Sequence, residues 1–221
     1  MGSSTGRRRL LVVEDEAQIR SLMSQILTAL GHEVRAAEDG LSALKEIRES
    51  TPDIILSDLN MPGMSGFELL SVVRRRLPGI YVIATSGAYA GSDIPRGIAA
   101  DAYYAKASGI QALVSLLSQA LEADPTRDRG DAESTPIWIC RESEEKHLVI
   151  NCPECLRNSL QASPDTIQTI HRTTCHSCGS VIHYAIIRPM GAEASQANLQ
   201  GLSSIAPKRR AIAPPIRTLG F

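Results

Sequence analysis

Short apolar runs alternate with helix-periodic segments through the first 121 residues, and this alternation restricts the possible folds more than any other feature of the chain. The apolar runs predict strands at residues 10–13, 33–37, 53–57, 81–85 and 102–105. Strands that alternate with helices in this way favour a parallel sheet with helices packed on both of its faces. We therefore predict an α/β fold for this part of the chain.

The segments between these runs have apolar residues at helical spacing. Gly31 is the expected C-terminal cap of the first helix. Further helices are expected at residues 41–47, 69–77, 92–100 and 110–121. The apolar residues that share one face of the first helix are Ile19, Leu22, Met23, Ile26, Leu27 and Leu30.

Polar residues follow the ends of four expected strands. Glu14 and Asp15 follow the first strand, Asp58 the third, Ser86 the fourth and Lys106 the fifth. In an open parallel sheet, ligands bind beyond the carboxyl ends of the strands. If the first and third strands are neighbours, the three carboxylates repel one another unless a cation lies among them, and such oxygen ligands suit Mg²⁺. Acids, a metal, a hydroxyl and an ammonium around one carboxylate predict a phosphoryl-transfer site.

Four motifs in order, "LLVVEDE", "LSDLNMPGMSG", "VIATSG" and "AYYAK", resemble the receiver domains of two-component response regulators. The resemblance covers about residues 8–121 and implies a doubly wound five-stranded sheet of the flavodoxin-like order 2-1-3-4-5. It also implies a signalling switch, with only self-phosphorylation and slow autodephosphorylation as its chemistry. The expected phosphoryl donor is a sensor histidine kinase or a phosphotransfer protein.

The resemblance assigns roles to the acidic residues one by one. It makes Asp58 the phosphoacceptor. It implies that Glu14, Asp15 and Asp58 hold Mg²⁺ together with the backbone carbonyl of Asn60.

The same resemblance implies a switch around that carboxylate. Ser86 would be the switch hydroxyl, Tyr103 the switch aromatic and Lys106 the phosphate-sensing lysine, although Tyr104 could take the aromatic role. The family usually has a proline after the lysine, joined through a cis bond, whereas this chain has Ala107. A cis bond to a residue other than proline costs about 3 kcal/mol. Either the site tolerates that cost, or the bond is trans and Lys106 reaches the site differently.

The cysteines are absent before position 140 and four of them form two CxxC pairs, "CPEC" and "CHSC". The second pair follows the first after 19 residues. This spacing is typical of a tetrahedral zinc site in a zinc-ribbon-like fold, where the metal supplies much of the folding energy. The expected ligands of a structural Zn²⁺ are Cys152, Cys155, Cys175 and Cys178.

Three other interpretations of the tetrad are possible, namely redox or disulfide pairs, a ligand set in which a histidine replaces a cysteine, and a catalytic metal. A redox CxxC is expected in a βαβ setting, which this segment lacks. One of His171, His176 and His183 could replace a cysteine, although four cysteines already complete a coordination shell. A closed shell leaves no position for water, which disfavours a catalytic metal.

We divide the chain into a receiver domain (8–121), a linker (122–135), a zinc-ribbon-like Cys₄ domain (136–189) and a flexible basic tail (190–221). Strands of the ribbon are expected at residues 137–140, 147–150, 166–172 and 181–187. The chain has no apolar run of the ~18 residues that a membrane span requires, so we expect a cytoplasmic protein without a membrane partner.

The output of such a switch is open to two hypotheses. The net charge of −1 favours no particular partner, and basic and acidic residues balance between positions 136 and 189. We therefore favour phosphorylation-controlled protein–protein interactions, through a homodimer or another protein. The alternative is a transcriptional regulator that binds DNA through the ribbon and the basic residues of the tail, namely Lys208, Arg209, Arg210 and Arg217.

Overall fold

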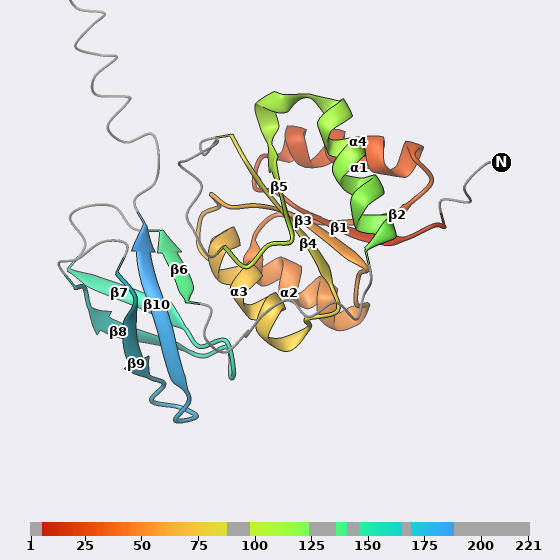
Figure 1. The fold of residues 1–221 in the computed structure, drawn as a ribbon. Helices are drawn as coiled ribbons and strands as arrows, with labels where there is room; N and C mark the ends of the chain where they lie inside the picture. The colour runs from red at the N-terminus through yellow and green to blue at the C-terminus, as the bar shows by residue number, and fades with distance from the viewer. Residues whose placement is uncertain (1–5, 88–97, 124–135, 141–145, 165–168, 188–221) are drawn as a thin grey trace, which may run out of the picture. The chain divides into compact units, whose positions relative to one another are not determined.

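The computed structural model describes residues 6–87, 98–123, 136–140, 146–164 and 169–187 (Figure 1). These described residues all belong to one compact unit that spans residues 1–189. The expected linker, apart from its first residues, lies outside the described residues, as do most of the helix expected at 92–100 and all of the expected tail.

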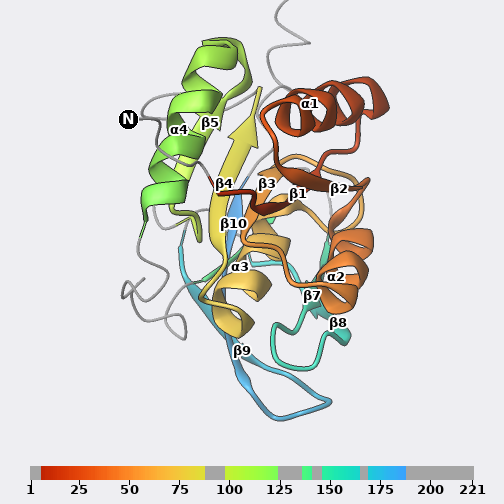
Figure 2. The same ribbon diagram turned by 90° about the vertical axis from the view of Figure 1, so that its right-hand side faces the viewer.

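The first half of the chain forms a five-stranded parallel sheet, which confirms the predicted fold class and strand order. The strands lie in the order β2-β1-β3-β4-β5 (Figures 1 and 2). Strand β3 lies in the middle and every one of its residues is buried. The strands are β1 (Arg9–Val13), β2 (Glu33–Ala37), β3 (Ile54–Asp58), β4 (Tyr81–Ser86) and β5 (Ala102–Ala105).

Four helices of the described residues cover the two faces of this sheet (Figure 2). One apolar cluster joins the sheet to α1 (Ala17–Ala29) and α4 (Ile110–Glu122). A second cluster joins its other face to α2 (Gly40–Glu49) and α3 (Gly66–Arg76). Gly31 follows α1 with φ +93°, as expected of a C-terminal cap.

The second half forms two small β structures, which confirms a β-rich second part. Three strands lie in the order β6-β10-β9, with β6 (Ile137–Cys140) parallel and β9 (His171–Thr174) antiparallel to β10 (Val181–Ile187). The strands β7 (His147–Asn151) and β8 (Asn158–Ala162) form an antiparallel hairpin. Sequence reasoning missed β8. Of the strand expected at 166–172, residues 166–168 lie outside the described residues, and the described strand here is β9, which begins at His171.

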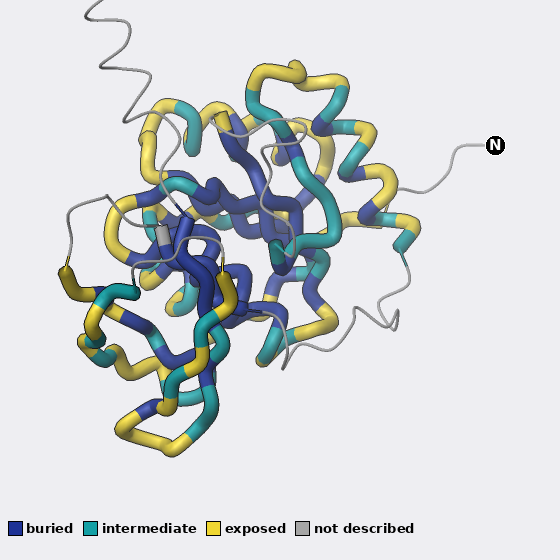
Figure 3. Tube along the Cα trace, turned by 60° about the vertical axis from the view of Figure 1, so that its left-hand side comes forward, coloured by how far each residue is buried: buried dark blue, intermediate teal, exposed yellow. Residues whose placement is uncertain are grey.

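The depth of burial differs between the helices (Figure 3). The helices α1, α2 and α4 each bury a single stripe of residues. In α3, every residue from Gly66 to Arg74 is buried. A helix that only covers a sheet keeps one polar face in solvent, so a second surface must cover the outer face of α3.

Candidate functional site

The acidic residues meet at the carboxyl ends of two neighbouring strands. Val13 pairs with Ser57 across β1 and β3, so the residues that follow each strand come together. One ligand oxygen from each of Glu14, Asp15 and Asp58 lies within 4.8 Å of the others. Glu14 and Asp58 are buried, whereas Asp15 is exposed. Three converging carboxylates that open to solvent on one side fit a Mg²⁺ ion that keeps part of its water shell.

Lys106 brings a positive charge to the two buried carboxylates. Its Nζ lies 2.7 Å from Oδ2 of Asp58 and 2.7 Å from Oε2 of Glu14. Burial raises the pKa of Glu14, and the hydrogen bond from Lys106 opposes that rise. Burial lowers the pKa of Lys106, but its hydrogen bonds with Asp58 and Glu14 outweigh burial and raise the pKa above its ordinary value. The hydrogen bonds with the two carboxylates thus stabilise the charged form of Lys106.

The Lys106–Ala107 peptide bond is trans. Lys106 begins a short 3₁₀ turn, Lys106–Ser108, directly after β5. Of the two geometries considered for this bond, the structure has the trans one, and the lysine still reaches both carboxylates.

Ser86 and Tyr103 lie together on one face of the sheet. Ser86 ends β4 and is 1% exposed, and its side chain shares a hydrogen bond with Tyr103. Burial raises the pKa of Tyr103. Tyr104 is the next residue of β5 and points to the opposite face, where it is buried and donates to the carbonyl of Gly109 at 3.3 Å. Of the two tyrosines, Tyr103 is therefore the one beside the expected switch hydroxyl.

The segment that connects β3 to α3 contacts both the side chain and the backbone of Asp58. The Asn60 N–H donates to Oδ1 of Asp58 at 3.3 Å, and the side-chain Oδ1 of Asn60 is buried without a hydrogen-bond partner among the residues that the structure describes. A Cβ on Gly66 would lie 1.8 Å from the carbonyl oxygen of Asp58. Only glycine therefore permits this approach of α3 to the site.

Two residues with a structural role at the site were missed by sequence reasoning. Gly66 is one of them. The other is Arg20, whose Nη1 donates to the carbonyl oxygens of Glu14 at 2.6 Å and Asp15 at 3.0 Å and so fixes the backbone of the acidic pair. Gly66 ends the motif "LSDLNMPGMSG", but its role, like that of Arg20, depends on contacts made only in the folded chain.

The four cysteines of the two CxxC pairs lie together. Sγ of Cys152 lies 3.7 Å from that of Cys178, and Sγ of Cys155 lies 3.6 Å from that of Cys175. These separations are too long for disulfides. Four thiolates about 2.3 Å from a central zinc would lie about 3.8 Å apart, so the cluster fits a tetrahedral zinc ion.

The two CxxC turns have the same backbone form. The N–H groups of Leu156 and Gly179 donate to the carbonyls of Cys152 and Cys175, at 2.8 and 2.9 Å. Both donors have positive φ, +58° for Leu156 and +76° for Gly179. Leu156 is the only residue other than glycine with positive φ among the residues that the structure describes.

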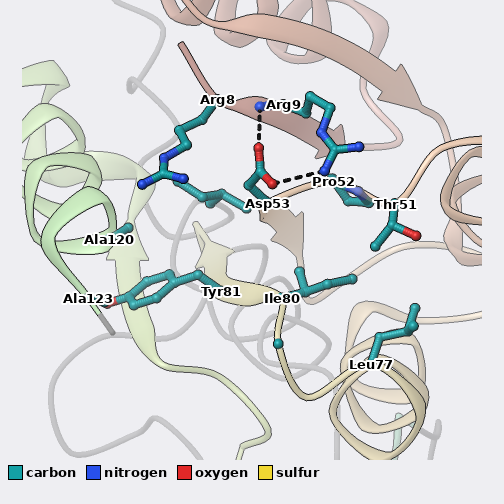
Figure 4. Close-up of a pocket in the computed structure, with 12 residues that line it drawn as sticks. Arg8, Arg9, Thr51, Pro52, Asp53, Leu77, Ile80, Tyr81, Ala120 and Ala123 are labelled. Atoms are coloured by element: carbon teal, nitrogen blue, oxygen red, sulfur yellow. Dashed lines mark hydrogen bonds and ion pairs between the residues drawn. The ribbon is translucent and has the colours of Figure 1, made fainter. Parts of the chain in front are cut away.

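A separate pocket of about 290 Å³ lies at the opposite end of the sheet (Figure 4). Its walls come from the amino ends of β1, β3 and β4. Here Arg9 donates to Asp53 from its backbone N–H at 2.8 Å and from its Nη2 at 3.0 Å. The pocket shares no residue with the carboxylate site.

The comparisons with known proteins agree with the geometry of the first half of the chain. Residues 10–118 match the family described as the response regulator receiver domain. This part of the chain belongs to that family. A receiver domain is a signalling switch rather than an enzyme, and receiver domains in general have histidine kinases as partners.

Two curated relatives are similar to the chain over about a third of its length. The DNA-binding response regulator MtrA of Mycobacterium bovis is 39% identical over 70 residues, which are 32% of this chain and 31% of that protein. The transcriptional regulatory protein AfsQ1 of Streptomyces coelicolor is 42% identical over 77 residues, or 34% of each chain. The chain thus spans about a third of the length of these two relatives.

Among solved structures, the response regulator protein TrrA of Thermotoga maritima, in complex with Mg²⁺–BeF, is 32% identical. The alignment covers 51% of this chain and 98% of that chain, with a TM-score of 0.47.

Proposed function

We propose that the chain is a response regulator of a two-component phosphorelay, which accepts a phosphoryl group on Asp58 and thereby switches protein–protein interactions. The observation that carries this proposal is the convergence of Glu14, Asp15 and Lys106 on the buried carboxylate of Asp58. That convergence occurs at the carboxyl end of the central strand of a receiver domain.

In the proposed reaction, a carboxylate oxygen of Asp58 attacks the phosphorus of a kinase or phosphotransfer phosphohistidine. An O–P bond forms, the P–N bond breaks, and the electron pair leaves with the imidazole. Mg²⁺ would be held by Glu14, Asp15, Asp58 and the carbonyl of Asn60, and it supplies positive charge to the transferring group. We expect Lys106 and Ser86 to hold phosphoryl oxygens afterwards.

The test is phosphorylation by acetyl phosphate in the presence of Mg²⁺, followed by mass spectrometry of the intact chain. The unmodified protein should gain one phosphoryl group that hydroxylamine removes, and Asp58→Asn should gain none. Asp53→Asn is the matched control, because Asp53 directly precedes the same strand at its other end, and it should be phosphorylated normally. Phosphorylation of the Asp58→Asn variant would refute the assignment.

We also propose that the cysteine tetrad holds one structural zinc ion. The S···S separations and the paired backbone turns support this ligand set. Elemental analysis of the purified full chain should give one equivalent of zinc. Cys178→Ser should lower the zinc content, whereas Cys140→Ser should not, because Cys140 lies outside the tetrad. A metal-free protein with four reactive thiols would refute the zinc site.

We propose protein–protein interaction as the output and the cytoplasm as the location of the protein. The proposed domain boundaries are 8–121 for the receiver domain, 122–135 for the linker, 136–189 for the Cys₄ ribbon and 190–221 for the tail. Opposite charges balance across residues 136–189, and a Cys₄ zinc centre would add negative charge, which disfavours contact with phosphates. None of the helices that the structure describes is long and apolar enough to cross a bilayer.

A further inference from the structure

The outer face of α3 is covered by the ribbon of the same chain. Strand β6 packs against α3. Trp138, Ala185 and Ile187, from β6 and β10, belong to the same apolar cluster as the buried residues of α2, α3 and the sheet. Trp138 is 7% exposed. These contacts account for the burial of α3 from Gly66 to Arg74.

Hydrogen bonds and an ion pair connect both ends of α3 to the ribbon. In the first turn, Oε1 of Glu68 accepts a hydrogen bond from Nδ2 of Asn151 at 3.1 Å. In the last turn, Arg75 forms an ion pair with Glu154, and Nη2 of Arg76 donates to the carbonyl of Glu154 at 2.6 Å. Glu154 lies inside the first CxxC turn, and Asn151 directly precedes that turn. The zinc-binding part of the ribbon is therefore held directly against α3.

The loop that joins Asp58 to α3 also faces the ribbon. Met61, Pro62 and Met64 of this loop line a cleft of about 620 Å³, and Leu148 and Val149 of β7 line it from the ribbon. The same loop contacts Asp58 through the N–H of Asn60, and Gly66, the first residue of α3, lies against the Asp58 carbonyl. A displacement of this loop at the acidic site would thus alter a surface on which the ribbon lies.

We propose that α3 and the β3–α3 loop form an intramolecular docking surface for the zinc ribbon, and that phosphorylation of Asp58 weakens this docking. The proposal rests on the phosphorylation of Asp58 proposed above. The docked contacts form while the Asp58 carboxylate is paired with Lys106. A phosphoryl group on Asp58 would lie between the carboxylate and Lys106 and would change the contacts that Asp58 makes with the β3–α3 loop. Because coupling between two sites is reciprocal, loss of docking must in turn favour the phosphorylated form.

Trp138 is the only tryptophan of the chain and reports on this interface directly. The experiment uses the zinc-loaded full chain with Mg²⁺, and beryllofluoride replaces the phosphoryl group. Acrylamide quenching of Trp138 fluorescence should rise at least twofold when beryllofluoride binds. The double variant Arg75→Ala/Arg76→Ala should show raised quenching without beryllofluoride and should bind beryllofluoride at least threefold more tightly. Arg48→Ala, an exposed arginine in the last turn of α2, is the matched control and should behave as the unmodified chain does.

Fluorine NMR of bound beryllofluoride separates the possible failures. Suppose that the bound signal depends on Asp58, but Trp138 quenching is unchanged or lower and the double variant binds beryllofluoride with unchanged affinity. This result overturns the coupling and leaves the proposed function intact. Absence of a bound signal in the unmodified chain overturns both.

Discussion

At the scale of single residues, the two CxxC turns differ at one informative position. Leu156 and Gly179 both have positive φ, a conformation that costs a residue with a Cβ about 1–2 kcal/mol and costs glycine little. Leu156 is 41% exposed, so its side chain loses little apolar contact on removal. We expect Leu156→Gly to stabilise the zinc-loaded chain by about 1 kcal/mol and Gly179→Ala to destabilise it by a similar amount. Urea unfolding followed by Trp138 fluorescence measures both changes.

The control for this pair is Gly79→Ala. A Cβ at Gly79 would have no neighbour within 4 Å, as at Gly179, but Gly79 is not among the glycines with positive φ. The control should therefore leave the free energy of unfolding almost unchanged. A Leu156→Gly variant that is less stable than the unmodified chain would contradict the argument from backbone conformation.

At the scale of an element, α3 begins with a carboxyl group that titrates near neutrality. Burial raises the pKa of Glu68 to about 7, against hydrogen bonds from Asn151 and Ser65 that lower it. The unfolded chain releases this proton near pH 4.5, so the folded chain holds one proton more between pH 4.5 and about 7. The free energy of unfolding should therefore fall as pH rises through that range, by an amount on the order of 3 kcal/mol.

The matched variant for this pH dependence is Glu68→Gln, which keeps the shape and cannot ionise. Relative to the unmodified chain, it should be of similar stability at pH 4.5 and more stable at pH 8. His147 lines the same cleft and is present in both chains, so the difference between their unfolding curves isolates Glu68. Parallel curves for the two chains from pH 4.5 to 8 would contradict the prediction.

Also at this scale, the sequence predicts elements well where apolar periodicity reflects burial and poorly where it does not. Strands β1, β3, β4 and β5 of the receiver sheet are found because each contains an apolar run between turns. Strand β8 escapes because it is mostly polar and its Leu160 is 66% exposed, so pairing with β7 holds it rather than an apolar face. In α1, Met23 and Leu27 are buried but Leu22 is exposed, as is Leu30 at the C-terminal cap, because only a narrow stripe of this helix meets the sheet.

The candidate sites also contain some features that local sequence patterns predict and others that they do not. Asp58 and the cysteines are evident in the sequence because strand ends and CxxC spacing place them. The trans bond after Lys106 and the covered outer face of α3 depend on contacts between distant segments, and no local pattern encodes those contacts.

At the scale of the whole molecule, the covered helix predicts that zinc stabilises the receiver domain as well as the ribbon. The ribbon core is small, so metal binding is expected to supply much of its folding free energy. Without zinc, the ribbon would no longer cover α3, and Glu68 and Arg75 of that helix would lose their contacts with Asn151 and Glu154. We expect a zinc-selective chelator, with Mg²⁺ in excess, to lower the unfolding midpoint of the receiver by about 4 °C or more, since a loss of 1 kcal/mol shifts a domain of this size by that much.

Circular dichroism at a helical wavelength follows the receiver, which contains the helices of the described residues, while Trp138 fluorescence follows the ribbon. Cys140→Ser treated in the same way controls for thiol chemistry outside the tetrad and should respond as the unmodified chain does. If the helical transition stays at the same temperature while Trp138 becomes exposed, the ribbon folds on the receiver without stabilising it, and the cover on α3 has no energetic role.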